Sequence, residues 1–213
     1  MNKLLVLGAG GHCLSVIDSI AKGTYSKILA LDLPENVGKN ILGIEIVGYD
    51  DEAKKYYDKG FTEAFITLGT IGNTSRRRAL YRKLKEIGFK FPNIIDPSAI
   101  VSENVILGEG NFIGKGTIVN TGVKVGNCCI LNTKSCIDHG SYIEDFVNIS
   151  PGTSISGDVK IGHDTHIGTG SSIIQGINIG EYTMIGAGSV VVRDIPSRVV
   201  AYGCPCKVKR ENN

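Results

Sequence analysis

The stretch that decides the fold runs from Ile95 to Val191 and begins IDPSAIVSENVILGEGNFIGKGTIVNTGVKVG at residues 95–126. Every sixth residue in it is Ile, Val or Leu, and the spacing is unbroken. These residues are Ile95, Val101, Leu107, Ile113, Val119, Val125, Leu131, Ile137, Ile143, Ile149, Ile155, Ile161, Ile167, Ile173, Ile179, Ile185 and Val191. An α-helix repeats about every 3.6 residues and a single strand every two, so neither keeps one residue class on a period of six. The repeat predicts a solenoid of short strands.

Small side chains and glycines mark the turns of this repeat. Ala, Ser or Thr lies two residues before many aliphatic positions, as at Ala99, Thr117, Ser135, Ser141, Thr153, Thr165, Ser171, Thr183 and Ser189, and Gly108, Gly114, Gly126, Gly162, Gly168, Gly180 and Gly186 directly follow others. We expect the aliphatic side chains to point inward and glycine to supply the unusual backbone angles of the corners. Three sides close one coil, and paired coils stack about 4.8 Å apart. The spacing does not set the handedness, since parallel crossovers are right-handed in about 98% of cases.

The first part of the chain alternates strands and helices instead. An apolar run at residues 3–7 leads into Gly8-Ala9-Gly10-Gly11-His12, and an amphipathic stretch follows at residues 13–22. Such a turn presents backbone N–H groups at the start of a helix, which suits a phosphate. Cys13 stands where a dinucleotide fingerprint has its third glycine. A second predicted strand, residues 27–31, ends at Asp32, about where an acidic residue would meet a ribose hydroxyl.

Further elements follow to about residue 91. We expect strands at residues 44–47, 63–68 and 89–91 and helices at residues 50–59 and 73–87, with Gly69 after the middle strand and Gly88 closing the last helix. The basic residues of the last helix are interpreted as a solvated face. Together these elements predict a small Rossmann-like parallel α/β domain. It is too short for the two halves of a full NAD domain, which favours one nucleotide or a nucleotide-linked substrate.

Bulk properties exclude several classes of protein. The chain has 213 residues, 42% hydrophobic residues, 21% charged residues and a net charge of +2, which gives no argument for nucleic acid or a membrane surface. We expect no transmembrane helix. The apolar start is too short for a signal peptide, so a cytoplasmic protein is expected. The spacings at Cys128-Cys129 and Cys204-Pro205-Cys206 do not match a zinc site, so free thiols and no metal are expected.

We therefore divide the chain into three parts. Residues 1–92 form the α/β domain, residues 93–192 form the solenoid, and residues 193–213 form a tail. Pro196 and Pro205 end the repeat within that tail. We expect the tail to cap an otherwise open coil end.

Four features together resemble one family. They are the Gly8–His12 turn, the hexapeptide repeat, the segment Ile130-Leu131-Asn132-Thr133 with Ile137-Asp138-His139, and the ending Gly203-x-Pro205-x-Lys207. The combination is similar to the NeuD/PglD-like sugar acyltransferases, which use acetyl-CoA. The resemblance covers essentially the whole chain. It implies a left-handed parallel β-helix, a homotrimer with active sites between subunits, and acetyl transfer to the amino group of a UDP-linked amino-dideoxysugar of the bacillosamine type.

The resemblance also assigns residues. The UDP part is expected at Gly8, Ala9, Gly10, Gly11, His12, Asp32 and Gly69, and acetyl-CoA at Asn148, Ser156, Gly157, Asp158, Gly186, Ala187 and Lys207. His139 falls on the family's catalytic histidine, and Asn132 on an asparagine near the sugar amine. An amine that attacks a thioester must lose a proton, which suits imidazole near neutrality. The thioester oxygen needs a donor such as a backbone N–H, and Gly157, one coil beyond His139, would let CoA approach.

Two positions depart from the family pattern. Gly140 stands where the family has an acidic residue after the catalytic histidine, so Asp138 or a neighbouring subunit would have to supply a carboxylate for His139. Asn148 stands where the family has a second histidine that contacts acetyl-CoA.

Other functions stay open at this point. One is an O-acetyltransferase acting on a sialic acid or related sugar, and another is a non-catalytic sugar-nucleotide-binding trimer. A zinc hydratase would need converging histidines, but the spacing puts His139 and His163 on different faces of the coil. His163 and His166 fall on the outside of the coil, where we expect solvated or interface side chains.

Overall fold

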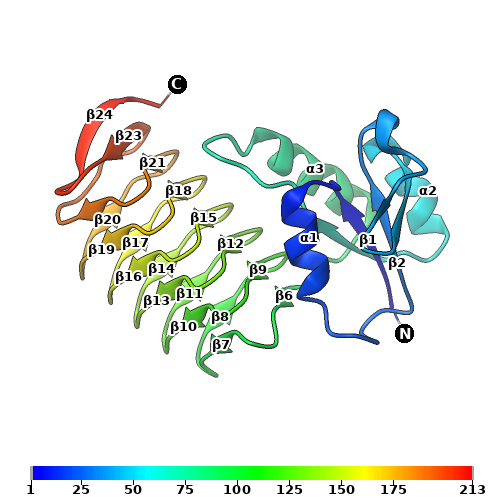
Figure 1. Cartoon of the computed structure of the whole chain (residues 1–213), viewed down its shortest axis with the longest axis horizontal. Coiled ribbons are helices and arrows are strands. Elements are labelled where there is room, and N and C mark those ends of the chain that lie inside the picture. The colour runs from blue at the N-terminus through cyan, green and yellow to red at the C-terminus, as the bar shows by residue number, and fades with distance from the viewer. Residues whose placement is uncertain (1, 213) are drawn as a thin grey trace. The chain divides into compact units, whose positions relative to one another are not determined.

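A computed structural model describes residues 2–212, which form two compact units. The first unit holds the described residues up to Thr70 together with Thr74–Ile94, and the second holds Ile71–Asn73 and the chain from Ile95 onward. Figure 1 shows the elements of each unit along the chain. Within residues 2–212 no helix combines the length and apolar character that crossing a membrane requires.

The first unit is built on a five-stranded sheet with the order β3-β4-β2-β1-β5. Its strands are β1 (Lys3–Leu7), β2 (Lys27–Leu31), β3 (Asn40–Ile41), β4 (Ile44–Gly48) and β5 (Glu63–Ile66). The central strand β1 pairs in parallel with both β2 and β5, and the β3–β4 hairpin forms one edge. Because the chain leaves β1 toward one side and returns through β5 on the other, the carboxyl ends of these strands form a switch point where α/β sheets bind ligands.

Three helices accompany this sheet: α1 (Gly11–Asp18), α2 (Ala53–Asp58) and α3 (Ser75–Ile87), with single 3₁₀ turns at Pro34–Asn36 and Asp50–Glu52. Tyr56 of α2 and Leu84 of α3 share one core cluster with Leu5 and Leu7 of β1. Successive residues of a strand point to opposite faces, and Leu4 and Val6 of β1 are buried as well. This apolar run reflects a parallel sheet covered on both faces, and Figure 1 shows α1 and α2 on opposite sides of it.

Some sequence-based boundaries in this unit are wrong. Helix α1 begins at Gly11 and ends at Asp18, earlier at both ends than the expected 13–22. The expected strand at residues 89–91 is only an isolated bridge between Lys90 and Glu63. The short strand β3 had no detectable pattern. The C-cap is as expected, because Gly88 adopts the left-handed conformation with φ +106°.

The second unit is a left-handed parallel β-helix, as the resemblance implied. The strands of its hexapeptide repeat are two residues long, and each ends on an aliphatic position of the repeat. They are β6 (Ile94–Ile95), β7 (Ile100–Val101), β8 (Ile106–Leu107), β9 (Phe112–Ile113), β10 (Ile118–Val119), β11 (Lys124–Val125), β12 (Ile130–Leu131), β13 (Cys136–Ile137), β14 (Tyr142–Ile143), β15 (Asn148–Ile149), β16 (Ser154–Ile155), β17 (Lys160–Ile161), β18 (His166–Ile167), β19 (Ser172–Ile173), β20 (Asn178–Ile179), β21 (Met184–Ile185) and β22 (Val190–Val191).

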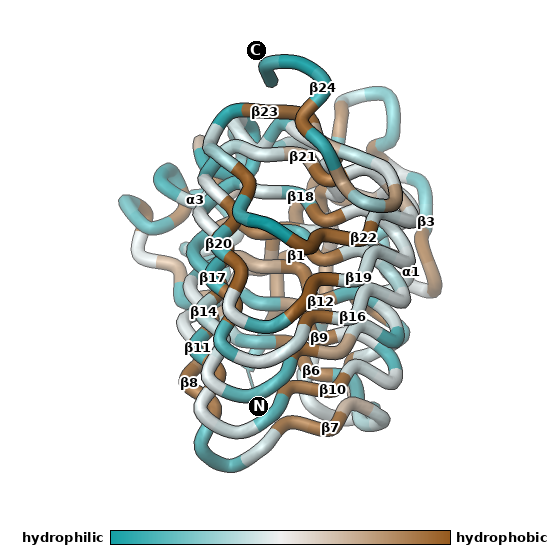
Figure 2. Tube along the Cα trace, turned by 90° about the vertical axis from the view of Figure 1, so that its left-hand side faces the viewer, coloured by the Kyte–Doolittle hydropathy of each residue, from teal (hydrophilic) through white to brown (hydrophobic). Residues whose placement is uncertain are grey.

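Every third strand pairs in parallel, which makes three sheets and three columns of turns. One sheet has the order β22-β19-β16-β13-β10-β7 and a second has β20-β17-β14-β11-β8. The register joins Ile118 to Cys136, so each residue stacks on the one eighteen positions further along (136 − 118 = 18). Figure 2 shows hydrophobic positions recurring from coil to coil, with hydrophilic turns between them.

The aliphatic positions form the core of this unit, and they are buried from Ile113 through Val191. Ile95 is an exception, with 40% of its surface exposed, because β6 is an end strand with a coil on only one side. The small polar residues before these positions are also buried, and several of them donate a hydrogen bond to a carbonyl group of the next coil. The Thr165 hydroxyl, for example, donates to the carbonyl oxygen of Gly180 at 2.8 Å, which removes the cost of burying it.

The glycines that directly follow aliphatic positions do not supply the left-handed corner angles. That angle occurs two residues later, as at Gly116 (φ +63°) and Gly170 (φ +67°). Gly168 is required for a different reason: a Cβ there would lie 2.5 Å from the backbone nitrogen of Ala187 in the next coil. The repeat therefore uses glycine both for tight stacking and for turning.

The tail continues the β-helix before it reverses. Ile195 bridges to Ile179, and β23 (Val199–Tyr202) pairs in parallel with β21. The last strand, β24 (Lys207–Glu211), pairs with β23 in the antiparallel direction. These two strands extend the third sheet, whose order is β24-β23-β21-β18-β15-β12-β9-β6.

The core can be tested at Ile161, which is buried on β17, with the exposed neighbour Lys160 as the matched control. We expect Ile161→Ala to lower the free energy of unfolding by about 3 kcal/mol, because it leaves a cavity between stacked coils. Lys160→Ala should change it by less than about 0.5 kcal/mol. Urea unfolding followed by circular dichroism measures both. Equal effects of the two substitutions would contradict the conclusion that the Ile161 side chain points into the core.

Candidate active site

His139 lies in the turn between β13 and β14, and its side chain is exposed. Its imidazole rests on Gly157, the residue one coil further along (157 − 139 = 18): a Cβ on Gly157 would lie 2.6 Å from Nε2. The sequence predicted this stacking, but the space above Gly157 is filled by the imidazole. Glycine is needed here because any side chain would push the ring off the coil.

Asp138 hydrogen-bonds the backbone of His139 and the side chain of Asn120, and it does not hydrogen-bond the His139 imidazole. Its Oδ1 accepts the backbone N–H of His139 at 2.8 Å and the side-chain amide of Asn120 at 2.9 Å. The backbone N–H first, and then the Asn120 amide, lower the pKa of the Asp138 carboxyl below its usual value. Among residues 2–212, no group hydrogen-bonds a ring nitrogen of His139. The imidazole therefore keeps both nitrogens available for a ligand.

The next coil offers one backbone donor beside the ring. The N–H of Ser156 donates to the carbonyl of Ile173 at 3.0 Å, and the N–H of Asp158 donates to the carbonyl of His139 at 2.8 Å. Of these three consecutive residues, only Gly157 makes no backbone hydrogen bond through its N–H within the described chain. An uncommitted N–H next to an imidazole is the arrangement that acyl-transfer sites use for a developing oxyanion.

The Asp158 carboxylate occupies the space over Gly140. Gly140 has φ +68°, and a Cβ there would contact Asp158 Oδ1 and lie 3.4 Å from its Cγ. The other oxygen of Asp158 accepts the Gln175 amide at 3.5 Å. Asp158 is itself in the left-handed conformation with φ +60°. His139, Gly140, Gly157 and Asp158 thus form one cluster over two stacked turns.

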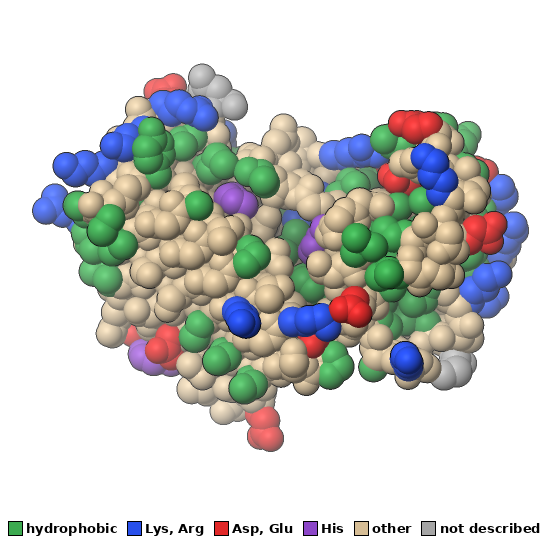
Figure 3. All heavy atoms as spheres, viewed as in Figure 1, with side chains coloured by type: hydrophobic (Ala, Val, Ile, Leu, Met, Phe, Trp, Pro, Cys, Tyr) green, Lys and Arg blue, Asp and Glu red, His purple; other side chains and the backbone are tan. Residues whose placement is uncertain are grey.

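The other predicted residues of this unit stand elsewhere on the β-helix. Asn132 lies in the turn between β12 and β13, where its Oδ1 accepts the backbone N–H of Thr133 at 2.8 Å. Gly186 and Ala187 lie in the same column of turns, Asn148 lies on β15, and Lys207 on β24. One chain therefore does not bring Asn132 and His139 to the same corner. Figure 3 shows Lys and Arg side chains gathered at the end of the unit that carries β24.

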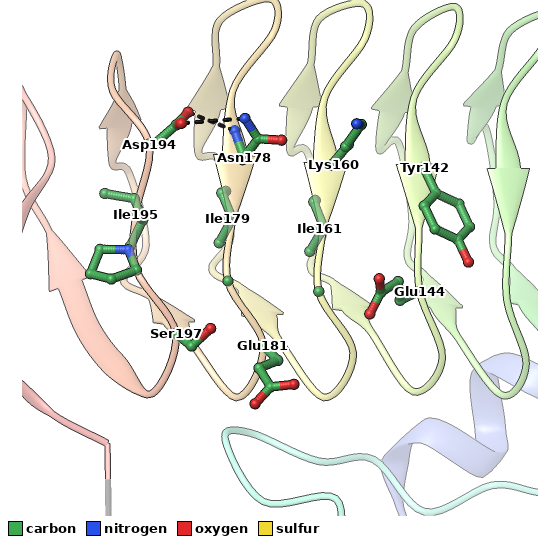
Figure 4. A pocket seen from close by; sticks show the side chains of 13 residues that line it. Tyr142, Glu144, Lys160, Ile161, Asn178, Ile179, Glu181, Asp194, Ile195 and Ser197 are labelled. Carbon is green, nitrogen blue, oxygen red and sulfur yellow. Dashed lines mark hydrogen bonds between the residues drawn. The ribbon is translucent and has the colours of Figure 1, made fainter.

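A surface groove of about 630 Å³ lies on the sheet that contains β14, β17 and β20. Figure 4 shows Tyr142, Lys160 and Asn178 along the strands and Glu144 and Glu181 at the turns. Asn178 hydrogen-bonds Asp194 at 3.3 Å. None of the predicted site residues lines this groove.

The glycine turn of the first unit, Asp32 and Gly69 follow β1, β2 and β5, so the structure brings them to the carboxyl ends of three adjacent parallel strands. Gly8 needs its small size, because a Cβ there would lie 2.6 Å from Leu68 Cδ2, and its φ is +104°. A Cβ on Gly10 or Gly11 would meet nothing within 4 Å. The start of α1 is therefore open to an anion.

His12 and Arg77 lie beside this turn. His12 packs on Gly69, where a Cβ would lie 3.3 Å from its own Cβ. Burial, and then the positive charge of Arg77, lower the pKa of His12 to about 4. Burial also raises the pKa of the Cys13 thiol to about 11, which keeps it protonated.

The interpretation of the basic α3 helix as a solvated face is wrong for Arg77, which is 2% exposed. Sequence reasoning missed this residue although a signal was present. Arg77 shares the helical spacing of the buried residues Leu80 and Leu84, so it faces the core.

The side chains of His163 and His166 contact other residues of the β-helix. His163 lies in the turn after β17, with Nδ1 2.7 Å from Asp164 Oδ2 and Nε2 2.7 Å from Glu181 Oε2. Of the two alternatives expected for His166, solvated or interface, the solvated one is wrong, because the side chain is 8% exposed and lies 3.3 Å from the Ser150 hydroxyl. Burial lowers the pKa of His166. Within residues 2–212, no three His, Cys, Asp or Glu side chains gather as metal ligands would.

The lowered pKa of His12 can be tested through stability. Its value is 6.5 when unperturbed and about 4 in the fold, so the unfolded chain binds the proton first as the pH falls. Stability is then lost between those two values, by about 2 kcal/mol from pH 7 to pH 5. We expect His12→Phe to reduce this loss in urea unfolding, while Leu14→Ala, an exposed change on α1, leaves it unchanged. The same pH dependence in His12→Phe and wild type would contradict the assignment.

Comparisons with known proteins agree with both units. The family described as PglD N-terminal domain matches residues 3–84, and the bacterial transferase hexapeptide repeats match residues 158–193. A histidine mutant of perosamine N-acetyltransferase from Caulobacter crescentus, in complex with CoA and GDP-perosamine, is 32% identical, with a TM-score of 0.93 over 99% of this chain and 98% of that one. The acetyltransferase domain of PglB from Neisseria gonorrhoeae, in complex with acetyl coenzyme A, is 34% identical, with a TM-score of 0.91 over 98% and 100%. The chain belongs to the NeuD/PglD-like family of hexapeptide-repeat sugar acyltransferases and is an acetyl-CoA-dependent sugar N-acetyltransferase.

Proposed function

We propose that the enzyme transfers the acetyl group of acetyl-CoA to the amino group of a UDP-linked amino-dideoxysugar of the bacillosamine type, with His139 as the general base. The observation that carries this proposal is the state of the His139 ring. It is exposed, it rests on Gly157, and no described residue hydrogen-bonds its nitrogens. A general base must have such a free nitrogen to reach the proton it removes.

The geometry supports a direct transfer. The sugar amine attacks the thioester carbonyl, a C–N bond forms, and the amine proton passes to a nitrogen of His139. The carbonyl oxygen becomes negatively charged, and the uncommitted N–H of Gly157 is placed to stabilise it. When the C–S bond breaks, the imidazolium returns the proton to the leaving thiolate. The products are the acetamido sugar and free CoA.

Sugar-nucleotide binding is assigned to the strand ends of the first unit. The backbone N–H groups of the exposed Gly10 and Gly11 donate no backbone hydrogen bond within the described chain and suit the diphosphate, and the buried charge of Arg77 favours an anion nearby. Asp32, which accepts the Asn36 amide at 2.9 Å, is positioned for a ribose hydroxyl. The Caulobacter relative carries GDP-perosamine, so a GDP-linked amino sugar is the specific alternative to a UDP-linked one.

The active site belongs between subunits of a homotrimer in this proposal. His139 and Asn132 occupy different columns of turns in one chain. A second copy that presents its Asn132 column to the His139 column of the first would unite them. Gly186 and Ala187 share the Asn132 column, so acetyl-CoA bound along that column would reach both residues.

Free-thiol release tests the reaction. We expect CoA release with acetyl-CoA and a UDP-linked 4-amino sugar, less with GDP-perosamine, and none with the matching 4-hydroxy sugar. His139→Ala should lower kcat by about 10²- to 10⁴-fold, because the amine proton then has no acceptor. His163→Ala is the matched control and should retain activity. Release with the hydroxy sugar alone would favour the O-acetyltransferase, and no release with any acceptor would favour a sugar-nucleotide-binding scaffold.

Gly157→Ala tests whether the contact between Gly157 and the His139 imidazole is required for activity. The added methyl group must displace the ring, and a shift of about 1 Å at a catalytic group can cost about 10²-fold in rate. We therefore expect kcat to fall by about that factor while the fold stays intact. Ser154→Ala, an exposed change on the preceding strand β16, is the control. Unchanged kcat in Gly157→Ala would show that the ring works from another position.

A further inference from the structure

We propose that the ring of His163 is held as a cation between two carboxylates, and that its charge makes the attachment of the C-terminal tail dependent on pH. His163 lies in the turn between β17 and β18. Its Nδ1 lies 2.7 Å from Asp164 Oδ2, and its Nε2 lies 2.7 Å from Glu181 Oε2. Neither contact involves His139, so this cluster is independent of the acetyl-transfer reaction.

The two contacts decide which form of the ring fits. A neutral imidazole carries a proton on one nitrogen and a lone pair on the other, and an ionised carboxylate only accepts hydrogen bonds. A neutral His163 would therefore direct a lone pair at a carboxylate oxygen 2.7 Å away, on one side or the other. When both nitrogens carry protons, both contacts become attractive, because the positive ring then lies between two negative groups. The geometry favours the cation.

Several acids face the ring from two turns. On its own turn, the Asp164 carboxylate is buried, which is costly unless a cation lies against it. From the turn after β14, the carboxylate of Glu144 accepts the backbone N–H of His163 at 3.0 Å. Asp145 of that turn lies one coil before His163 (163 − 145 = 18), and its carboxylate accepts the backbone N–H of Asn127. These negative charges favour a proton on the ring.

The turn after β20 supplies the other side of the cluster. One carboxylate oxygen of Glu181 faces His163 Nε2, and the other lies 3.4 Å from the guanidinium of Arg198. The Tyr182 ring stands edge-on to the imidazole, with the ring centroids 5.0 Å apart. The Arg198 guanidinium lies 4.5 Å from the centroid of the Tyr182 ring. Glu181 thus bridges the imidazole and the guanidinium.

Backbone hydrogen bonds connect this cluster to the end of the tail. The N–H of Arg198 donates to the carbonyl of Glu181 at 2.8 Å, and the N–H of Asn212 donates to the carbonyl of Arg198 at 2.8 Å. The side-chain amide of Asn212 also donates to the carbonyl of Tyr182 at 2.8 Å. The position of Glu181 therefore affects how firmly the tail is attached.

Loss of the ring proton would act mainly on Glu181, whose side chain is 36% exposed and can turn away, whereas Asp164 is buried. The ion pair that Glu181 keeps with Arg198 is exposed and contributes little. The folded chain holds a proton on His163 that the unfolded chain releases, so this contribution to stability decreases as the pH rises. The direction is opposite to that of His12, whose contribution is lost as the pH falls.

NMR of protein with isotope-labelled histidine tests the charge. At about pH 7.5, where an ordinary exposed histidine is mostly neutral, we expect protons on both ring nitrogens of His163, with signals assigned by their loss in His163→Gln. The titration midpoint of the ring should move to lower pH in Glu181→Gln. It should not move in Glu103→Gln, which changes an exposed acid between β7 and β8. A single protonated nitrogen, or an unmoved midpoint in Glu181→Gln, would overturn the inference.

Hydrogen exchange tests the effect on the tail. In the wild type, the protection of the Arg198 and Asn212 amides, corrected for intrinsic exchange, should fall by about 10-fold between about pH 6 and about pH 9, as expected for the loss of one charged contact. In His163→Gln it should already be low at about pH 6 and change little. The Gly114 amide, which donates to the Leu131 carbonyl nearer the start of the β-helix, is the internal control. The same pH dependence in wild type and variant would overturn the inference.

Discussion

The structure depends on one constraint, which is that each residue of the β-helix stacks on the residue eighteen positions further along. Backbone N–H groups donate along these columns, as from Asp158 to His139 and from Gly176 to Gly157. The aliphatic side chains point inward only while that register holds, since a slip of one residue would turn them out. The hydrogen bonds and the core therefore enforce the same spacing, and each turn has a fixed neighbour above and below it.

Because of this stacking, the candidate site is formed by residues from two adjacent turns. A residue at His139 has its environment set mainly by residues 157 and 158, which are remote in sequence but adjacent in space. Gly157 supplies the seat for the ring, and the bare Gly140 leaves the volume that Asp158 occupies. The surroundings of each turn are therefore set by the next coil as well as by the neighbours in sequence.

The sequence predicted the structure best where one spacing repeats many times, as in the β-helix. It predicted least where the role of a residue depends on a single three-dimensional contact. The six-residue spacing predicted each aliphatic position of the β-helix and the stacking of His139 on Gly157. The spacing could not separate two roles of glycine. Gly168 is required for tight stacking and Gly170 for a left-handed turn, but both positions are glycine in the sequence. The helical spacing of Arg77 relative to Leu80 and Leu84 predicts its burial. The sequence analysis missed this because the neighbouring basic residues suggested a solvated helix. The hydrogen bonds of Asp138 to the backbone N–H of His139 and to the side-chain amide of Asn120 depend on three-dimensional contacts that the six-residue spacing does not predict.

The environments of the four histidines support the proposal that His139 is the general base. His12 is held neutral down to a pKa of about 4 by burial and by Arg77, so it is a poor proton acceptor near neutrality. His166 is buried against Ser150, and both nitrogens of His163 face carboxylates. Of the four, His139 alone combines exposure, ring nitrogens that no described residue hydrogen-bonds, and an uncommitted backbone N–H beside the ring. General-base catalysis needs those properties together, because the ring must reach the amine, take its proton and carry the resulting charge.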